Sequence, residues 1–579
     1  MLKIKKLDPI FSLFFFLSRK RKIQILFLLF FQLINGVLEF FSVSAIVPFL
    51  SIFVLKNDLN QIPIIGSILI HLGFVNISES FFLITFFFCL LILLSTFFRI
   101  FNLRYTYKLA ANIEIDLSRK IFKDNIFQSY IDYTKKNSSD FISITIDKVS
   151  SSTHAISSFL ILTGGLILGI FIIFSLLFVN WQIVSASSFF LLFYYLIIYK
   201  KVSKTLSRNG KSIASISPKR IGLMQEVFLG FRDIIVNGTQ NIYIEIFNRL
   251  DSEYKLKGAS TRFIRIFPRY LIEGIVILIL AIFGYNLFLL NFDLISFIPI
   301  LGSVIYAFQK LLPLIQLTYA TWADYCVRFH VIVDVLRQLE SNKNNKIIQK
   351  KNKIFFDDIV IFKNIYFAYS ASNFILKDIN FKIFKGEHIG IFGETGSGKS
   401  TLLDVIIGLL PPSKGKIYID GIDLYKGNYD WTTNIAHVSQ NIFLKDGTIA
   451  ENIAYGQLPE EINYELLERS SRIAQVYDFI KKLKMGFETK VGERGIRLSG
   501  GQRQRITIAR AIYQSREILV LDEATSALDS ITESKIIDSI KNNSNLTILM
   551  VTHRLESLQS CDRVFKLENN KLIEKEKTQ

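Results

Sequence analysis

The residues with the clearest chemical potential form a glycine-rich segment, Gly-Glu-Thr-Gly-Ser-Gly-Lys-Ser, between the strand-like run Ile389–Phe392 and a helical stretch. Glycines let backbone N–H groups wrap phosphates, and the following helix N-terminus favours negative charge. Lys399 would reach the β- and γ-phosphates, and Ser400 would ligate Mg²⁺. The segment therefore predicts a nucleotide site. Its expected contacts are Gly393, Glu394, Thr395, Gly396, Ser397, Gly398, Lys399, Ser400 and Thr401.

A second chemically informative run is Ile-Leu-Val-Leu-Asp-Glu, which ends at Asp522 and Glu523. An apolar strand that ends in two carboxylates would place Asp522 at Mg²⁺ and Glu523 beside the γ-phosphate, as general base for the attacking water. The alternative is that both carboxylates merely cap the next helix.

Between these two segments lies Leu498-Ser499-Gly500-Gly501-Gln502, which resembles the signature motif of ABC ATPases. Other elements follow in that family's order: an aromatic loop at Phe367-Ala368-Tyr369, a glutamine loop at Gln440, an exporter-type loop at Thr489–Gly495, a D-loop at Ser526-Ala527-Leu528-Asp529 and a switch histidine at His553. The resemblance implies ATP as the nucleotide, with Mg²⁺. It also implies catalytic roles for Glu523, His553 and Gln440, and Mg²⁺ contacts from Ser400, Gln440 and Asp522. The further ATP contacts that it implies are Tyr369, Asp522, Ser499, Gly500, Gly501, Gln502 and Asp529.

The signature motif also carries an expectation about assembly. Ser499 and Gly501 open a predicted helix, so their hydroxyl and N–H groups suit a γ-phosphate. In the family these groups face the phosphate loop of a second ATPase domain, and this chain has one such domain. The resemblance therefore implies a dimer, with a homodimer as the simpler choice and a heterodimer with another intact half left open.

The elements that position these residues divide the chain in two. Half of the residues are hydrophobic, 53 are Phe, and the mean hydropathy is positive, which indicates lipid as part of the solvent. We expect an all-α six-helix transmembrane domain fused to a C-terminal α/β P-loop ATPase domain. The expected boundaries are an interfacial helix at 1–23, the transmembrane domain at 24–335, a polar linker at 336–353 and the ATPase domain at 354–579. The expected spans lie at 25–55, 81–103, within 155–199 as a pair with a turn near Asn180-Trp181, at 270–290 and at 294–317; a short outer helix is expected at 64–75.

Charge predicts the orientation. The net charge is +19, and Lys and Arg gather in 1–22, 104–150 and 201–269. Basic loops stay on the cytoplasmic side, so both termini are expected in the cytoplasm of a bacterial cell, with the spans in its inner membrane. This distribution argues against nucleic acid as the partner. The three scattered cysteines favour neither a disulfide framework nor a metal site.

Ionisable residues within the spans are the candidate substrate contacts, because such residues usually face a cavity or a partner. They are Glu39, Arg99, Arg269, Glu273 and Lys310. One interpretation is a basic ring that grips an anionic head group, with the two acids holding helices in register. The alternative is that the long basic chains snorkel to the membrane surface.

Short segments around these residues resemble bacterial lipid-linked oligosaccharide flippases of the PglK type: Leu38–Phe40 followed by Ser44–Phe49, Pro268–Gly274 and Tyr306–Pro313. The resemblance implies a lipid-linked glycan as substrate. Lys310 stands where Arg is expected, and a lysine offers pyrophosphate a point charge rather than a two-pronged contact.

Two stretches, 126–147 and 230–249, resemble coupling segments of exporters, with plain helix packing as the alternative. Two rival functions stay open at this point. One is an exporter of another amphiphile, such as a lipid, drug or peptide. The other is a nucleotide-gated channel or sensor, which would tolerate loss of Glu523 or of the signature motif, although both are intact.

Overall fold

The structure, a computed structural model, describes residues 9–46, 49–50, 77–179, 181–289, 294–344, 352–369, 373–427, 429–525, 527–543 and 546–576. It divides into two compact units: Met1–Gln128 with Thr134–Ile347, and Ser129–Tyr133 with Ile348–Gln579. The expected outer helix at 64–75 lies outside the described residues.

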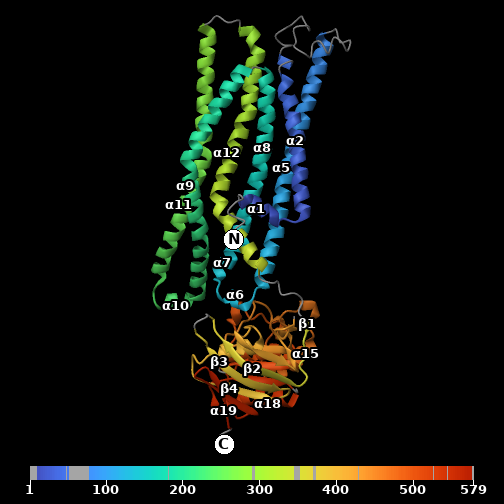
Figure 1. The fold of residues 1–579 in the computed structure, drawn as a ribbon, viewed down its shortest axis with the longest axis vertical. Helices are drawn as coiled ribbons and strands as arrows, with labels where there is room; N and C mark the ends of the chain where they lie inside the picture. Colours follow the sequence, from blue (N-terminus) through green and yellow to red (C-terminus); the bar gives the residue numbers. More distant parts are fainter. Residues whose placement is uncertain are drawn as a thin grey trace. The chain divides into compact units, whose positions relative to one another are not determined.

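The first unit is helical (Figure 1). Its long helices are α2 (Arg19–Ser44), α5 (Ile77–Ile126), α8 (Val149–Val179), α9 (Trp181–Leu229), α11 (Gln240–Leu289) and α12 (Leu294–Asn344). Shorter pieces are α1 (Pro9–Phe16), α7 (Ser138–Ile142), the π-helix η3 (Ser143–Lys148) and α10 (Phe231–Val236); α6 (Tyr130–Thr134) falls almost wholly in the second unit. The breaks after Val179 and after Leu289 fall where polar residues interrupt the apolar runs. The expected linker, 336–353, is helical as far as Asn344.

Among the described residues, three stretches are long and apolar enough to cross a membrane: Arg19–Ser44, Phe81–Ile126 and Ser138–Ser175. The large side chains of α5 are exposed, with Phe82 at 72%, Leu93 at 68% and Phe97 at 64%. Such a surface suits contact with lipid or with another apolar surface, because water would disfavour so much exposed apolar area.

Helix α11 contains a proline, Pro268, just before the expected fifth span at 270–290. Proline has no N–H, so the carbonyl of Ile264, four residues earlier, loses its partner within the helix. The hydroxyl of Tyr319 on α12 donates to this carbonyl at 3.1 Å. A contact between helices therefore satisfies a polar group that the sequence of one helix leaves free.

The second unit is an α/β domain with a six-stranded sheet in the order β12-β11-β4-β10-β9-β8 and a four-stranded antiparallel sheet in the order β3-β2-β5-β6; β1 pairs with β7. The strands are β1 (Asn352–Lys353), β2 (Ile359–Phe367), β3 (Leu376–Phe384), β4 (His388–Phe392), β5 (Lys414–Ile419), β6 (Ile422–Asp423), β7 (Tyr429–Asp430), β8 (Ile435–Val438), β9 (Ile518–Asp522), β10 (Thr547–Val551), β11 (Arg563–Glu568) and β12 (Lys571–Lys575). The helices are α13 (Lys399–Ile407), α14 (Ile449–Ile453), α15 (Tyr464–Ile473), α16 (Tyr477–Lys482), α17 (Gly500–Tyr513), α18 (Ser530–Asn543) and α19 (Leu555–Leu558), with 3₁₀ turns at Thr432–Asn434, Pro459–Glu461, Gly486–Glu488 and Glu493–Gly495.

Strands β9 and β10 are buried on both faces. Along β10, Leu549 and Val551 enter one hydrophobic core, together with α13 and the four-stranded sheet. Ile548 and Met550 enter the other core, with α14 to α18. Successive side chains of a strand point to opposite faces, so an unbroken apolar run suits a parallel strand covered on both sides. This burial fixes the carboxyl end of β9, where Asp522 lies.

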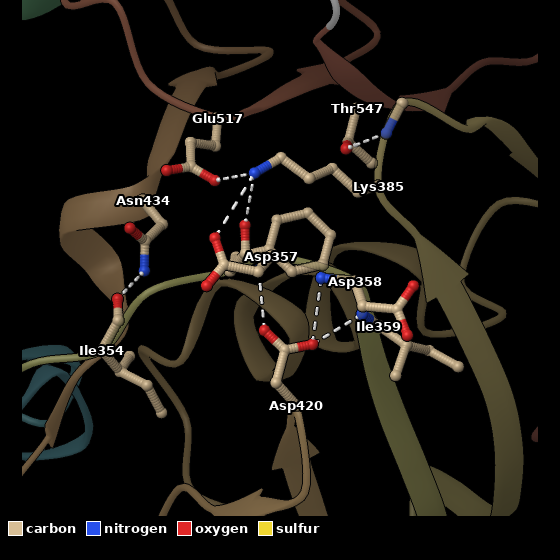
Figure 2. A network of polar contacts seen from close by, with 11 residues as sticks. Ile354, Asp357, Asp358, Ile359, Lys385, Asp420, Asn434, Glu517 and Thr547 are labelled. Atoms are coloured by element: carbon tan, nitrogen blue, oxygen red, sulfur yellow. Dashed lines mark hydrogen bonds and ion pairs between the residues drawn. The ribbon is translucent and has the colours of Figure 1, made fainter.

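A polar network fixes the first residues of this domain (Figure 2). The carboxylate of Asp420 accepts hydrogen bonds from the backbone N–H groups of Asp357 at 2.7 Å, Asp358 at 3.1 Å and Ile359 at 2.7 Å. Lys385 pairs with Glu517 at 3.2 Å and donates to the carbonyl of Phe356 at 2.8 Å. The segment that leads into β2 is therefore attached at several consecutive residues.

Candidate functional site

The glycine-rich loop joins β4 to α13. Gly396 and Gly398 adopt φ of 85° and 101°, a region that favours glycine. A Cβ atom at Gly393 would lie 2.5 Å from the carbonyl oxygen of Leu567. The hydroxyl of Ser397 is buried and has no hydrogen-bond partner within the described part of the chain. Backbone conformation and an unused polar group thus both suit a bound phosphate chain.

Charge is concentrated at the start of α13. Lys399 is 8% exposed, and its ammonium donates to the carbonyls of Gly393 at 2.9 Å and Glu394 at 2.8 Å. Burial lowers the pKa of Lys399, while Glu523 and Asp522 act in the opposite direction. A desolvated ammonium gains most from an anionic ligand such as a phosphate.

Two carboxyl groups, Asp522 and Glu523, act on this lysine, and a third, Asp404, interacts with Asp522. Burial raises the pKa of Asp522, and the neighbouring charge of Glu523 raises it further. Burial, followed by the charge of Asp522, raises the pKa of Asp404 on α13 to about 6. Sequence reasoning missed Asp404, because an acidic residue four positions after the loop carries no motif of its own. A divalent cation would relieve the repulsion within this group.

The donor set fits Mg²⁺. The hydroxyl of Ser400, the amide oxygen of Gln440 and the carboxylate of Asp522 are hard oxygen ligands, the type that Mg²⁺ prefers. Among the described residues no cluster of three His, Cys, Asp or Glu side chains forms a metal site by itself. The phosphates of the nucleotide would therefore supply part of the coordination, as is usual for Mg²⁺.

Glu523 is held from two sides. The amide Nε2 of Gln440 donates to its Oε2 at 2.6 Å, and His553 Nε2 lies 2.8 Å from its Oε1. Glu523 also adopts φ of 48°, in the left-handed region, and its amide donates to Val551 at 2.9 Å. Such a conformation costs roughly 1–3 kcal/mol in a non-glycine residue and is typical of functional sites. The structure thus brings together the three residues that were predicted to be catalytic.

The signature motif begins α17. The hydroxyl of Ser499 accepts from the N–H of Gln502 at 3.3 Å, and the side chain of Gln502 accepts from the N–H of Ser499 at 2.9 Å. This capping box leaves the first N–H groups of the helix, at Gly500 and Gly501, without partners in the first turn, as at any helix N-terminus.

Two further residues connect the site's loops and were missed from sequence. Gln504 accepts from the amide of Ala527 in the predicted D-loop at 3.0 Å. Arg554, directly after His553, donates to the carbonyl of Leu528 at 3.0 Å and pairs with Glu533 at 3.3 Å. These two hydrogen bonds connect the D-loop both to the signature helix and to the residue that follows His553. Ser526 lies outside the described residues, and Asp529 accepts from the amide of Thr532 at 2.9 Å.

Tyr369, the expected adenine contact, follows β2. Its side chain is half exposed, and its ring packs edge-on against Phe367 with centroids 5.0 Å apart. Phe367 thus supports the ring while the side chain stays accessible, an arrangement that suits stacking on a base.

In the first unit, the ionisable residues of the spans form pairs. Lys310 lies 2.8 Å from Glu39, whose side chain is 6% exposed and also accepts from Ser95. Arg269 lies 2.8 Å from Glu273, which further accepts from Gln316 at 3.3 Å. Arg99 on α5 is exposed and makes no ion pair with any described residue. Within one chain, then, each predicted acid pairs with one base, and Arg99 has no acidic partner among the described residues.

Comparisons of sequence and of structure both find ABC transporters. A profile of the family described as ABC transporter matches residues 376–526. The ATP-dependent lipid A-core flippase of Wigglesworthia glossinidia brevipalpis is 30% identical over 482 residues, which cover 80% of both chains. The protein of the same name from Escherichia coli (strain K12) is 28% identical over 483 residues, again 80% of both. A solved bacterial Atm1-family ABC exporter with ATP bound shares the fold, with a TM-score of 0.74 at 19% identity, over 96% of this chain and 94% of that one.

Proposed function

The chain belongs to the ABC transporter family as an exporter-type half-transporter, and from this premise we propose that it flips a lipid-linked oligosaccharide across the bacterial inner membrane. It is an ATP-hydrolysing membrane transporter of the lipid-flippase type. The glycan substrate, the homodimer and the cytoplasmic position of both termini are parts of the proposal.

The hydrolytic step follows from the site's geometry. Glu523 would accept the proton of the attacking water, while Gln440 and His553 hold its two oxygens in place. Lys399 and the N–H groups of the loop stabilise charge on the phosphates. When bound, Mg²⁺ supplies further neutralisation of the phosphate oxygens, held by Ser400, Gln440 and Asp522.

The observation that supports an anionic amphiphile is the imbalance of charge in the spans. Two bases are neutralised by two acids, whereas Arg99 stays uncompensated within the described residues. An unpaired arginine costs on the order of 3 kcal/mol at the centre of a spanning helix and less towards its end, where Arg99 lies. A pyrophosphate head group would offset that cost, and arginine can contact phosphate through two nitrogens.

A lipid A-core substrate is the second candidate, because the two relatives aligned over 80% of this chain carry that substrate in their names. Both candidates are large glycolipids, so the fold does not separate them. The distinction depends on which head group stimulates hydrolysis and is transported.

The test is reconstitution of the purified chain in liposomes. ATPase activity and appearance of substrate in the opposite leaflet are measured with a polyprenyl-pyrophosphate oligosaccharide, and separately with lipid A-core. Arg99→Ala should lower transport of the preferred lipid several-fold, whereas Arg104→Ala on the same helix serves as the matched control. Transport of lipid A-core alone would replace the proposed substrate by the second candidate. Equal transport by the Arg99→Ala and Arg104→Ala variants would remove Arg99 from the substrate site.

A further inference from the structure

A cavity of about 540 Å³ lies among the helices of the first unit, away from the paired residues of the spans. Its walls come from η3 and the start of α8, from α9, from α11 and from α12. The lining side chains that matter here are Asp147, Ser151, Ser217, Arg220, Tyr254 and Arg328. The cavity is therefore polar and basic, although it belongs to a largely apolar unit.

Arg328 is the residue of this cavity whose charge is least compensated. Its Nη1 donates to the hydroxyl of Ser151 at 2.7 Å and approaches the carbonyl of the same residue at 3.5 Å. No carboxylate of the described chain lies within ion-pair distance of it; the neighbouring Asp324 is occupied by Arg265, at 3.1 Å and 3.2 Å. Burial lowers the pKa of Arg328, which shows that its charge is poorly solvated. A guanidinium has five N–H donors, so most of its capacity is available to a ligand.

Arg220, on α9, is a second basic residue that lines the cavity. It pairs with Asp251 at 2.6 Å and stacks on Tyr254 at 4.4 Å, which fixes the plane of its guanidinium. Its Nε is buried without a hydrogen-bond partner among the described residues. Asp147 is the acid that lines the cavity, and it accepts from Ser217 at 3.1 Å. Two guanidinium groups thus face a cavity lined by one carboxylate.

The backbone at the edge of the cavity is also unusual. Asp147 lies in η3, a π-helical segment of six residues between α7 and α8. A π-helix is rare, and single turns of it occur frequently at functional sites. Here it carries Ile146 and Asp147 to the cavity wall.

From these observations we infer that the cavity binds a phosphate group, with Arg328 and Ser151 as its main contacts and Arg220 beside them. Arginine suits phosphate because its planar fork can donate two parallel hydrogen bonds. Such a ligand would connect η3 and α8 to α9, α11 and α12. The phosphate could come from an anionic lipid head group or from a free anion, and this inference does not depend on which lipid is transported.

The experiment uses the full chain with Lys399→Ala, which weakens phosphate binding at the ATP site. Inorganic phosphate is titrated calorimetrically into protein held in phosphatidylcholine nanodiscs. In a second arm, native mass spectrometry counts phosphatidylglycerol retained from mixed nanodiscs. Adding Arg328→Gln should weaken one of these two signals at least ~10-fold, whereas Arg337→Gln, on an exposed part of α12, should leave both unchanged. Binding of inorganic phosphate identifies a free anion, and retention of phosphatidylglycerol without phosphate binding identifies a lipid head group.

A second pair of variants covers the case in which Arg328→Gln does not fold. Arg328→Lys keeps the positive charge but cannot donate two parallel hydrogen bonds. Ser151→Ala keeps the guanidinium but removes the hydroxyl that positions it. Both variants should weaken the same binding measurement that Arg328→Gln weakens, each to a smaller extent. If phosphate affinity and phosphatidylglycerol retention are the same in all folded variants, the inference is wrong.

Discussion

Glu523 shows how single residues set the chemistry of this transporter. Its two oxygens are held by Gln440 and His553, and its backbone is in the left-handed region. Glu523→Gln keeps the size of the side chain but removes the base. ATP turnover should fall by roughly 10²–10⁴-fold while ATP binding persists. Phosphate release and retention of nucleotide check this, with the exposed Glu460→Gln as control. Normal hydrolysis by the Glu523→Gln protein would contradict the assignment of the base.

Asp404 makes stability depend on pH. Its pKa is about 6 in the folded protein and 3.8 in its ordinary state. Between these two pH values the folded state keeps a proton that the unfolded state has lost, and above about 6 both states have lost it, the folded state at a cost in free energy. The carboxyl therefore favours folding most below the ordinary value, and that contribution is lost as the pH rises through about 6.

Asp404→Asn should accordingly stabilise the chain at alkaline pH by on the order of 1 kcal/mol, since the group is only half-buried and solvent screens part of the effect. The gain should disappear in acid, where both states hold the proton. Thermal unfolding at several pH values measures this, with Asp446→Asn at an exposed position as the matched control. A gain that is independent of pH would mean that the pKa of Asp404 is not raised.

At the scale of the elements, the proline within α11 gives a prediction about helix packing. Tyr319→Phe removes the hydroxyl that serves the free carbonyl of Ile264, so it should cost about 1 kcal/mol. In Pro268→Ala, a new N–H can bond that carbonyl within the helix, so the same tyrosine change should cost less. A double-mutant cycle on unfolding in detergent measures the difference. Equal costs in both backgrounds would show that the hydroxyl does not replace the missing amide.

Helix ends were predictable from sequence where polar residues interrupt apolar runs, as at the end of α8 at Val179, because hydropathy acts locally. The phosphate loop was predictable for the same reason: its strand, glycines and helix are adjacent in the chain. The pair Glu39–Lys310 was not predictable as a pair, since the two residues belong to helices far apart in sequence and only packing brings them together. Arg328 carries no motif, and only the cavity draws attention to it.

At the scale of the whole molecule, the proposed homodimer places the signature of one chain on the phosphate loop of the other. Lys399→Ala chains and Ser499→Arg chains should each be inactive alone, because both sites of either dimer are damaged. Co-reconstituted in equal amounts, they should regain about one quarter of wild-type ATPase activity, since half of the dimers keep one intact site. A mixture that stays inactive would indicate that the two motifs do not meet across a dimer.

The attachment of the ATPase domain's first segment has a consequence for how such chains diversify. Asp420 contacts the amides of residues 357–359, not their side chains. Any residue except proline supplies the same N–H, so this attachment places almost no demand on the sequence it holds. Recombination at this point could join foreign membrane domains to the same ATPase domain, provided that the acceptor retains Asp420. The linkage thus makes residues 357–359 a tolerant crossover point, provided that the preceding core residues Ile354 and Phe356 are retained.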